Sequence, residues 1–145
     1  MTLHAVDAAS HRASKINIYS PDTDVFMLSL RRYPQLCSDV HFVIGIGQRH
    51  QVINLKPTVQ ALGSTKVAAV PGLHALSGAD ITLSFAGKGK ATWRKDFREA
   101  DEDTITALAN RGKKAQPTII FSGIEKLVCQ EYVPNTTVNN DKELR

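Results

Sequence analysis

Residues 15–24 read Lys15-Ile16-Asn17-Ile18-Tyr19-Ser20-Pro21-Asp22-Thr23-Asp24. The first five residues alternate between polar and apolar or aromatic side chains and include β-branched ones, so they predict a strand over 15–19. Ser20 followed by Pro21 is typical of a helix start, with Ser as the N-cap and Pro at the first helical position. A strand that leads directly into a helix favours an α/β fold. It also puts two carboxylates, those of Asp22 and Asp24, at the end of a strand.

The rest of the chain predicts two more strands and several helices. Apolar runs predict strands at 40–44 and 51–54, and the first is expected to be central because it is almost wholly apolar. Helical spacing predicts helices over 3–13, 21–32, 58–62, 65–76, 91–98, 101–109 and 117–132. Gly63 is expected to end one helix and Pro71 to interrupt the next. We therefore expect one α/β domain over residues 1–132, with a small, mainly parallel sheet flanked by helices, and a disordered polar tail over 133–145.

The composition is that of an ordinary globular domain. The chain has 145 residues, of which 42% are hydrophobic and 22% charged, which suits a single domain with a modest core. No apolar run is long enough to span a bilayer, and the N-terminus lacks the layout of a secretion signal. We therefore expect a nuclear or cytoplasmic protein that is not secreted and has no membrane partner. Cys37 and Cys129 stand in no ligand spacing and predict free thiols.

A third carboxylate joins Asp22 and Asp24 as a candidate metal ligand. Asp80 follows Gly78 and Ala79, far along the chain from the first pair. Hard cations such as Mg²⁺ prefer oxygen ligands, and several carboxylates gathered at one point need a cation to neutralise them. The three aspartates therefore predict a Mg²⁺ or Mn²⁺ site. The alternative is local, because acids at 22 and 24 also suit a helix N-terminus and Gly-Ala-Asp also suits a turn.

A basic segment follows Asp80. Gly87-Lys88-Gly89-Lys90 precedes a predicted helix, so backbone N–H groups and two ammonium groups can face one phosphate. The chain carries a net charge of +4, which favours a polyanionic partner. We expect DNA or RNA as the partner, although a glycine-rich turn is also common in purely structural hairpins. Five cationic residues fall within eleven positions: Lys88, Lys90, Arg94, Lys95 and Arg98.

Three stretches together resemble a known family. They are residues 18–26 (Ile-Tyr-Ser-Pro-Asp-Thr-Asp-Val-Phe), 73–80 (Leu-His-Ala-Leu-Ser-Gly-Ala-Asp) and 84–90 (Ser-Phe-Ala-Gly-Lys-Gly-Lys). In this order they resemble PIN-like and flap-endonuclease-like nuclease domains, and more closely a transposon-associated group of such domains from animals. In that family the first stretch supplies two metal-binding aspartates and the second a further one. The third resembles the hairpin of a helix–three-turn–helix module that grips duplex phosphates.

The resemblance covers residues 3 to about 98 and departs from the family in two respects. The family has an acidic cluster and a first strand, with its own aspartate, upstream of the helix that begins here near Leu3, so the chain resembles the C-terminal portion of such a domain. Ala79 also replaces a cysteine that is usual in the family. Without the upstream acids, we expect weaker Mg²⁺ binding and a second metal without ligands.

The resemblance implies a metal-dependent nuclease that cleaves phosphodiester bonds. Asp22, Asp24 and Asp80 would be the catalytic metal ligands, and Lys88 and Lys90, with Arg94 and Lys95 beyond them, would bind the nucleic acid. Two alternatives stay open at this point. One is a catalytically silent nucleic-acid-binding module, and the other is a non-functional fragment of a mobile-element protein.

Overall fold

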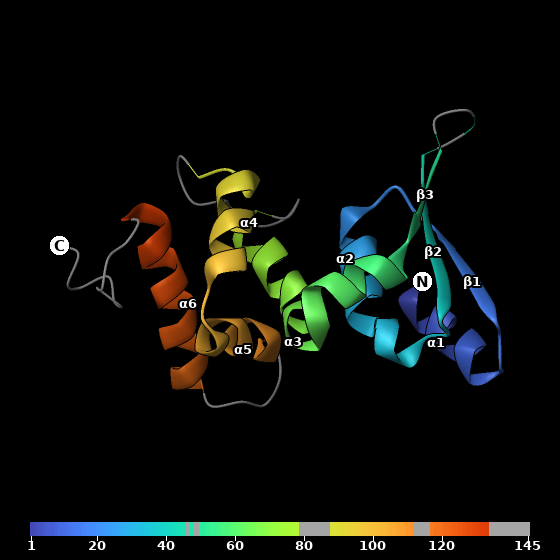
Figure 1. The fold of residues 1–145 in the computed structure, drawn as a ribbon, viewed down its shortest axis with the longest axis horizontal. Coiled ribbons are helices and arrows are strands. Elements are labelled where there is room, and N and C mark those ends of the chain that lie inside the picture. Colours follow the sequence, from blue (N-terminus) through green and yellow to red (C-terminus); the bar gives the residue numbers. More distant parts are fainter. Residues whose placement is uncertain (46, 48–49, 79–87, 112–116, 134–145) are drawn as a thin grey trace. The chain divides into compact units, whose positions relative to one another are not determined.

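The computed structural model describes residues 1–45, 47, 50–78, 88–111 and 117–133. The chain divides into two compact units, Met1–Ala68 and Ala69–Arg145, whose elements are drawn in Figure 1. The single domain expected over residues 1–132 stays a prediction, and most of the polar tail expected at 133–145 lies outside the described residues.

The first unit contains a three-stranded mixed sheet. Its strands are β1 (Lys15–Tyr19), β2 (Asp39–Ile44) and β3 (Gln51–Asn54), in the order β1-β2-β3. β2 is central, as predicted, and pairs parallel with β1 but antiparallel with β3. The expectation of a mainly parallel sheet was therefore wrong. The reason is the short connection between β2 and β3, which can close a hairpin but is too short for the crossover that a parallel pair requires.

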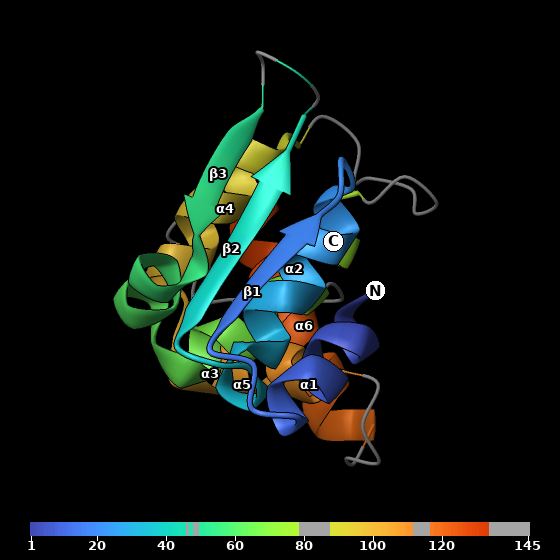
Figure 2. The same ribbon diagram turned by 90° about the vertical axis from the view of Figure 1, so that its right-hand side faces the viewer.

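Helices cover one face of this sheet. α2 (Thr23–Arg32), which continues into a 3₁₀ turn η1 (Tyr33–Gln35), lies behind the strands in Figure 2, and α1 (Thr2–Ser10) lies next to β1. Ile16 and Ile18 of β1 are buried, and Val40 and Phe42 of β2 have no exposed surface. The Phe26 ring of α2 meets the Phe42 ring edge-on, with centroids 5.1 Å apart. Among the described residues of this unit, no helix covers the opposite face, which is the one turned to the viewer in Figure 2.

α2 begins two residues later than the sequence predicts. Its N-cap is Asp22, whose side chain accepts a hydrogen bond from the backbone N–H of Asp24. The buried Ser20 hydroxyl accepts instead from the backbone N–H of Asp22, at 3.1 Å. Ser20 therefore shapes the turn between β1 and α2, and the acid takes the capping role because its carboxylate also favours the positive end of the helix dipole.

A long bent helix, α3 (Leu55–Leu76), connects the two units along the chain. The bend lies at Gly63, whose φ of 75° and ψ of 163° are not helical, so the break predicted there is confirmed. The break predicted at Pro71 is wrong, because the helix continues through this residue. Proline removes one backbone hydrogen bond, and here the surrounding turns keep their helical conformation without it.

The second unit is helical. It contains α4 (Lys90–Glu99), α5 (Glu102–Asn110) and α6 (Pro117–Tyr132), with the end of α3. Its core includes Trp93 and Phe97 from α4, which are one helical turn apart, together with Leu108 and Leu127. Gly123 of α6 lies close to α5, because a Cβ atom built there would lie 2.5 Å from the Cβ atom of Ala107.

We expect Gly123→Ala to destabilise the protein, although alanine is the better helix former. Intrinsic helix propensity favours the change by about 1 kcal/mol, but the overlap with Ala107 costs more, since added methyl groups in packed cores typically cost about 1–3 kcal/mol. Chemical denaturation should show a lower free energy of unfolding. Ala107→Gly in the same chain removes the overlapping atom, so the double variant should recover stability beyond the sum of the two single changes. Additive effects would show that the two helices do not meet at these residues.

Candidate functional site

Asp22 and Asp24 lie at the carboxyl end of β1, where the chain enters α2. Oδ1 of Asp22 accepts the backbone N–H of Asp24 at 2.8 Å, so part of this carboxylate is used as a helix cap. Asp22 is exposed and Asp24 half-buried. This geometry supports the local alternative that the sequence left open. It also leaves both acids beside a sheet edge where ligands commonly bind in α/β proteins.

The third predicted ligand, Asp80, lies outside the described residues. The part of the chain that is described holds no group of three or more His, Cys, Asp or Glu side chains able to bind a metal ion. Two carboxylates suit a Mg²⁺ ion that keeps several waters, but not a pair of metal ions. The Mg²⁺ or Mn²⁺ site therefore stays a prediction that requires Asp80.

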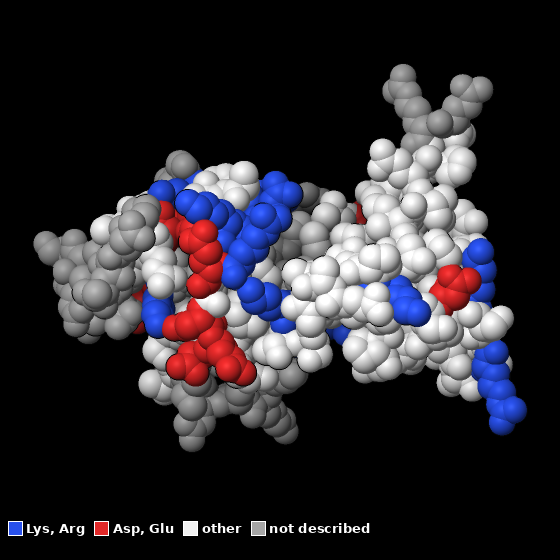
Figure 3. All heavy atoms as spheres, viewed as in Figure 1, with Lys and Arg blue, Asp and Glu red and all other residues white. Residues whose placement is uncertain are grey.

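α4 carries the predicted basic residues. Lys90, Arg94 and Lys95 are exposed, and the Arg94 side chain donates from Nε to the carbonyl of Lys90 at 3.2 Å. Because Lys90, Arg94 and Arg98 are four residues apart in sequence, they lie in one row along the helix. Figure 3 shows Lys and Arg side chains gathered over α4, with Asp and Glu side chains beside them.

Lys88, which we expected to bind phosphate, makes contacts within the second unit. Its Nζ donates to the backbone carbonyl of Glu131 at 2.5 Å and lies 5.1 Å from the centre of the Tyr132 ring. Lys88 therefore joins the segment before α4 to the last turn of α6. An ammonium group has three donors, so these contacts do not prevent binding to a phosphate, and that role stays a prediction.

Glu131 is a buried acid that sequence reasoning missed. Its side chain is 1% exposed, and its carboxyl oxygens have no hydrogen-bond partner among the described residues when both are treated as acceptors. Burial, and then the neighbouring Asp96 carboxyl, raise the pKa of Glu131 to about 7, while the Lys88 charge acts in the opposite direction. A proton on Glu131 turns it into a donor to Asp96. The helical pattern of α6 places residue 131 on its inner face, which was the available signal.

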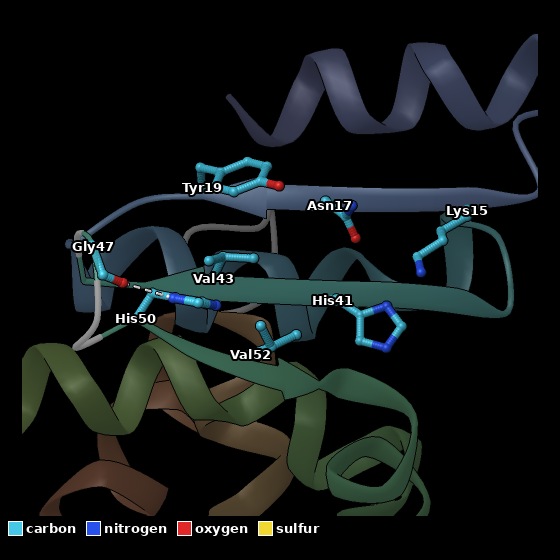
Figure 4. Close-up of a pocket in the computed structure, with 8 residues that line it drawn as sticks. All are labelled: Lys15, Asn17, Tyr19, His41, Val43, Gly47, His50 and Val52. Atoms are coloured by element: carbon cyan, nitrogen blue, oxygen red, sulfur yellow. Dashed lines mark hydrogen bonds between the residues drawn. The ribbon is translucent and has the colours of Figure 1, made fainter.

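A pocket on the uncovered face of the sheet was also missed. It has a volume of about 500 Å³ and is lined by side chains from all three strands and by the turn between β2 and β3 (Figure 4). The lining includes Lys15, Asn17 and Tyr19 from β1 and His41 from β2. The alternation in β1 predicts that residues 15, 17 and 19 share a face, but not that this face is left uncovered.

Comparisons with known proteins add no family to these observations: no protein-family model, no curated protein and no solved structure matches the chain. The nuclease resemblance therefore depends on the three sequence stretches alone. Among the described helices, none combines the length and the apolar content needed to cross a bilayer.

We expect the protein to lose stability as the pH rises from about 4.5 to about 7. Glu131 binds its proton more tightly in the folded chain, where its pKa is about 7, than in the unfolded chain, where it is near 4.5. The stabilisation is complete below the lower value and lost as the pH passes the higher one, and its size is on the order of 3 kcal/mol. Asp101 does not interfere, since hydrogen bonds from Lys126 and Thr104 lower its pKa to about 2.

Thermal unfolding across this pH range measures the effect. Glu131→Gln should flatten the dependence and raise the melting temperature at pH 8, because an amide carries no charge to bury. Glu99→Gln, a change at an exposed position on α4, is the matched control and should leave the dependence intact. An unchanged pH profile in Glu131→Gln would contradict the assignment.

Proposed function

We propose that this chain binds nucleic acid through the phosphate backbone, with the basic residues of α4 as the principal contacts. The observation that carries the proposal is the exposed cationic surface of α4, to which Lys90, Arg94 and Lys95 contribute. Like charges four residues apart destabilise a helix, and a polyanion that neutralises them relieves this cost. Trp93 and Phe97 anchor α4 in the core beside this surface, so the basic side chains are held on a rigid element.

Two acids of the second unit have partners inside the unit, although Glu99, Glu102 and Asp103 are also exposed there. Asp96 stands away from the basic row on α4 and adjoins the buried Glu131, and Asp101 is paired with Lys126. These two acids are therefore occupied within the unit. Backbone phosphates carry no sequence information, so binding through this surface is expected to be independent of base sequence.

We expect a double variant, Lys90→Ala with Lys95→Ala, to weaken binding to a labelled DNA duplex and to reduce its salt dependence. Each phosphate contact contributes about 0.7 to 0.9 to the slope of log K against log salt concentration. Losing two contacts should therefore lower the slope by about 1.4 to 1.8. Fluorescence anisotropy at several salt concentrations measures both quantities.

The matched control removes two exposed cations of the first unit, Arg12 and Lys56, by changing each to Ala. It has the same net charge as the test variant and should retain nearly the full salt slope. Equal losses in the two double variants would mean that binding follows net charge alone, and the assignment to α4 would fail. Affinity that stays flat with salt in the unchanged protein would defeat the proposed function itself.

A second candidate function is metal-dependent cleavage of phosphodiester bonds, favoured by the position of Asp22 and Asp24 at the carboxyl end of β1. In this hypothesis Asp22, Asp24 and Asp80 hold Mg²⁺ or Mn²⁺. A bound ion would activate water and stabilise the charge that develops on the phosphate. The contribution of the chain itself is to supply the carboxylate oxygens and to hold the backbone of the nucleic acid on its basic residues.

Asp22→Asn separates the capping role of this residue from metal binding. Asparagine caps helices about as well as aspartate, so stability should be kept, but the charge needed by the metal is lost. We expect Mn²⁺-dependent cleavage of single-stranded or flap DNA to fall by more than about tenfold, since a ligand of the catalytic ion is removed. Asp7→Asn, at an exposed acid of α1, is the control. Cleavage that withstands both a chelator and Asp22→Asn would exclude this candidate.

A further inference from the structure

The uncovered face of the sheet has a layered arrangement of side chains. The pairing register places Tyr19, Val43 and Val52 in one row across the three strands, and Asn17 and His41 in the next row. Figure 4 shows the first row running from strand to strand. Because a strand rises about 3.3 Å per residue, the two rows are about 7 Å apart. An apolar row therefore lies beside a polar row, and the distance between the two rows is close to the width of an aromatic ring system.

The middle of the apolar row is recessed between its two ends. Val43 is only 8% exposed, whereas Tyr19 on one side is 66% exposed and Val52 on the other 55%. Val43 therefore forms the floor of the pocket, and its two neighbours form the walls. The exposed Tyr19 and Val52 side chains, on the two sides of Val43, leave apolar surface in water, and a planar aromatic ligand would cover it.

The remaining lining is polar, and its charged groups are cationic or can become so. Lys15 supplies an ammonium group, and His50 sits at the turn with its Nδ1 2.8 Å from the carbonyl of Gly47. A carbonyl only accepts, so Nδ1 carries the proton, and Nε2 of His50 accepts when the ring is neutral and donates when it is protonated. No acid is among the lining residues, although Asp39 lies beside them: its Oδ1 is 3.3 Å from Nδ1 of His41, and it is the register partner of Lys15. The pocket thus suits an anionic ligand.

We propose that this pocket binds an unpaired nucleobase together with its phosphate, as part of a single-stranded nucleic acid. The base would stack on Tyr19 against Val43 and Val52, its polar edge would face Asn17 and His41, and the phosphate would lie near Lys15 or His50. Proteins that bind single strands commonly stack bases on exposed aromatic side chains, and sheet faces serve as the platform. The inference deepens the proposed function, on which it rests, by naming the class of nucleic acid.

A protein partner fits this face less well. The apolar part consists of three side chains, and it is bordered by amide, imidazole and ammonium groups. Stable protein interfaces are larger, and their centres are depleted of charged residues. A second copy of the chain would also bring Lys15 and the two histidines against their own counterparts, with no compensating acid in the lining.

The test uses a short single-stranded oligonucleotide that contains 2-aminopurine, whose fluorescence falls when the base stacks. We expect the full chain to quench this signal, and Tyr19→Ala to weaken binding about five- to hundredfold, the usual effect of losing one stacked base. Tyr19→Phe keeps the ring and should bind within about twofold of the unchanged protein. Val52→Glu puts a negative charge in the pocket and should also weaken binding. Circular dichroism checks that each variant is folded.

The matched control is Phe121→Ala, which removes an equally exposed aromatic side chain from α6 in the second unit. It should leave quenching unchanged. If Tyr19→Ala binds and quenches like the unchanged protein, the pocket proposal is overturned. Sedimentation that shows a dimer which Tyr19→Ala dissociates would overturn it as well, because a second copy would then occupy this face.

Binding of a DNA duplex by the same variants separates this inference from the proposed function. Tyr19→Ala should bind duplex normally, and the double variant at Lys90 and Lys95 should not. If the single strand fails to quench while duplex binding keeps its salt dependence, only the pocket proposal fails. If neither nucleic acid binds the unchanged chain, the proposed function fails and the pocket proposal with it.

Discussion

The parallel pairing of β1 with β2 is the constraint on which the first unit depends. Two neighbouring strands can run parallel only if the chain crosses back over the sheet between them, and α2 with η1 makes that crossing. Phe42 of the central strand has no exposed surface, and the Phe26 ring of the crossing helix packs edge-on against it. The same pairing sends Tyr19 and Asp22 to one end of the sheet. The pocket wall and the helix cap are therefore neighbours for a topological reason.

Much of this local structure is predictable from the sequence. The alternation at 15–19, the apolar run at 40–44 and the stop at Gly63 reflect short-range preferences that few tertiary contacts override, and all three are confirmed. The antiparallel course of β3 was missed, since it depends on how short the β2–β3 connection is rather than on any residue type. Pro71 was misjudged because propensity describes an isolated helix, whereas here the flanking turns, with Val70 and Leu73 buried, hold it.

The candidate sites show where sequence reasoning ends. The carboxylates of Asp22 and Asp24 and the basic residues of α4 could be listed from the chain, because charge and spacing are visible there. The contacts of Lys88 and the burial of Glu131 could not, since each depends on a partner distant in sequence, whereas the capping role of Asp22 was one of two alternatives that the sequence left open. The pocket is a further case. The alternation of a strand predicts which side chains share a face, but only the structure shows which face of the sheet no described helix of the first unit covers.

Gly63 gives the chain a bend that no other residue would allow at low cost. Its φ of 75° and ψ of 163° fall in a region open almost only to glycine. With any larger residue the easiest relief would be ordinary helical geometry. The 22 residues of α3, which are divided at Gly63, would then form one straight helix about 33 Å long. The direction that α3 takes after residue 63 is thus decided by the lack of a single methyl group.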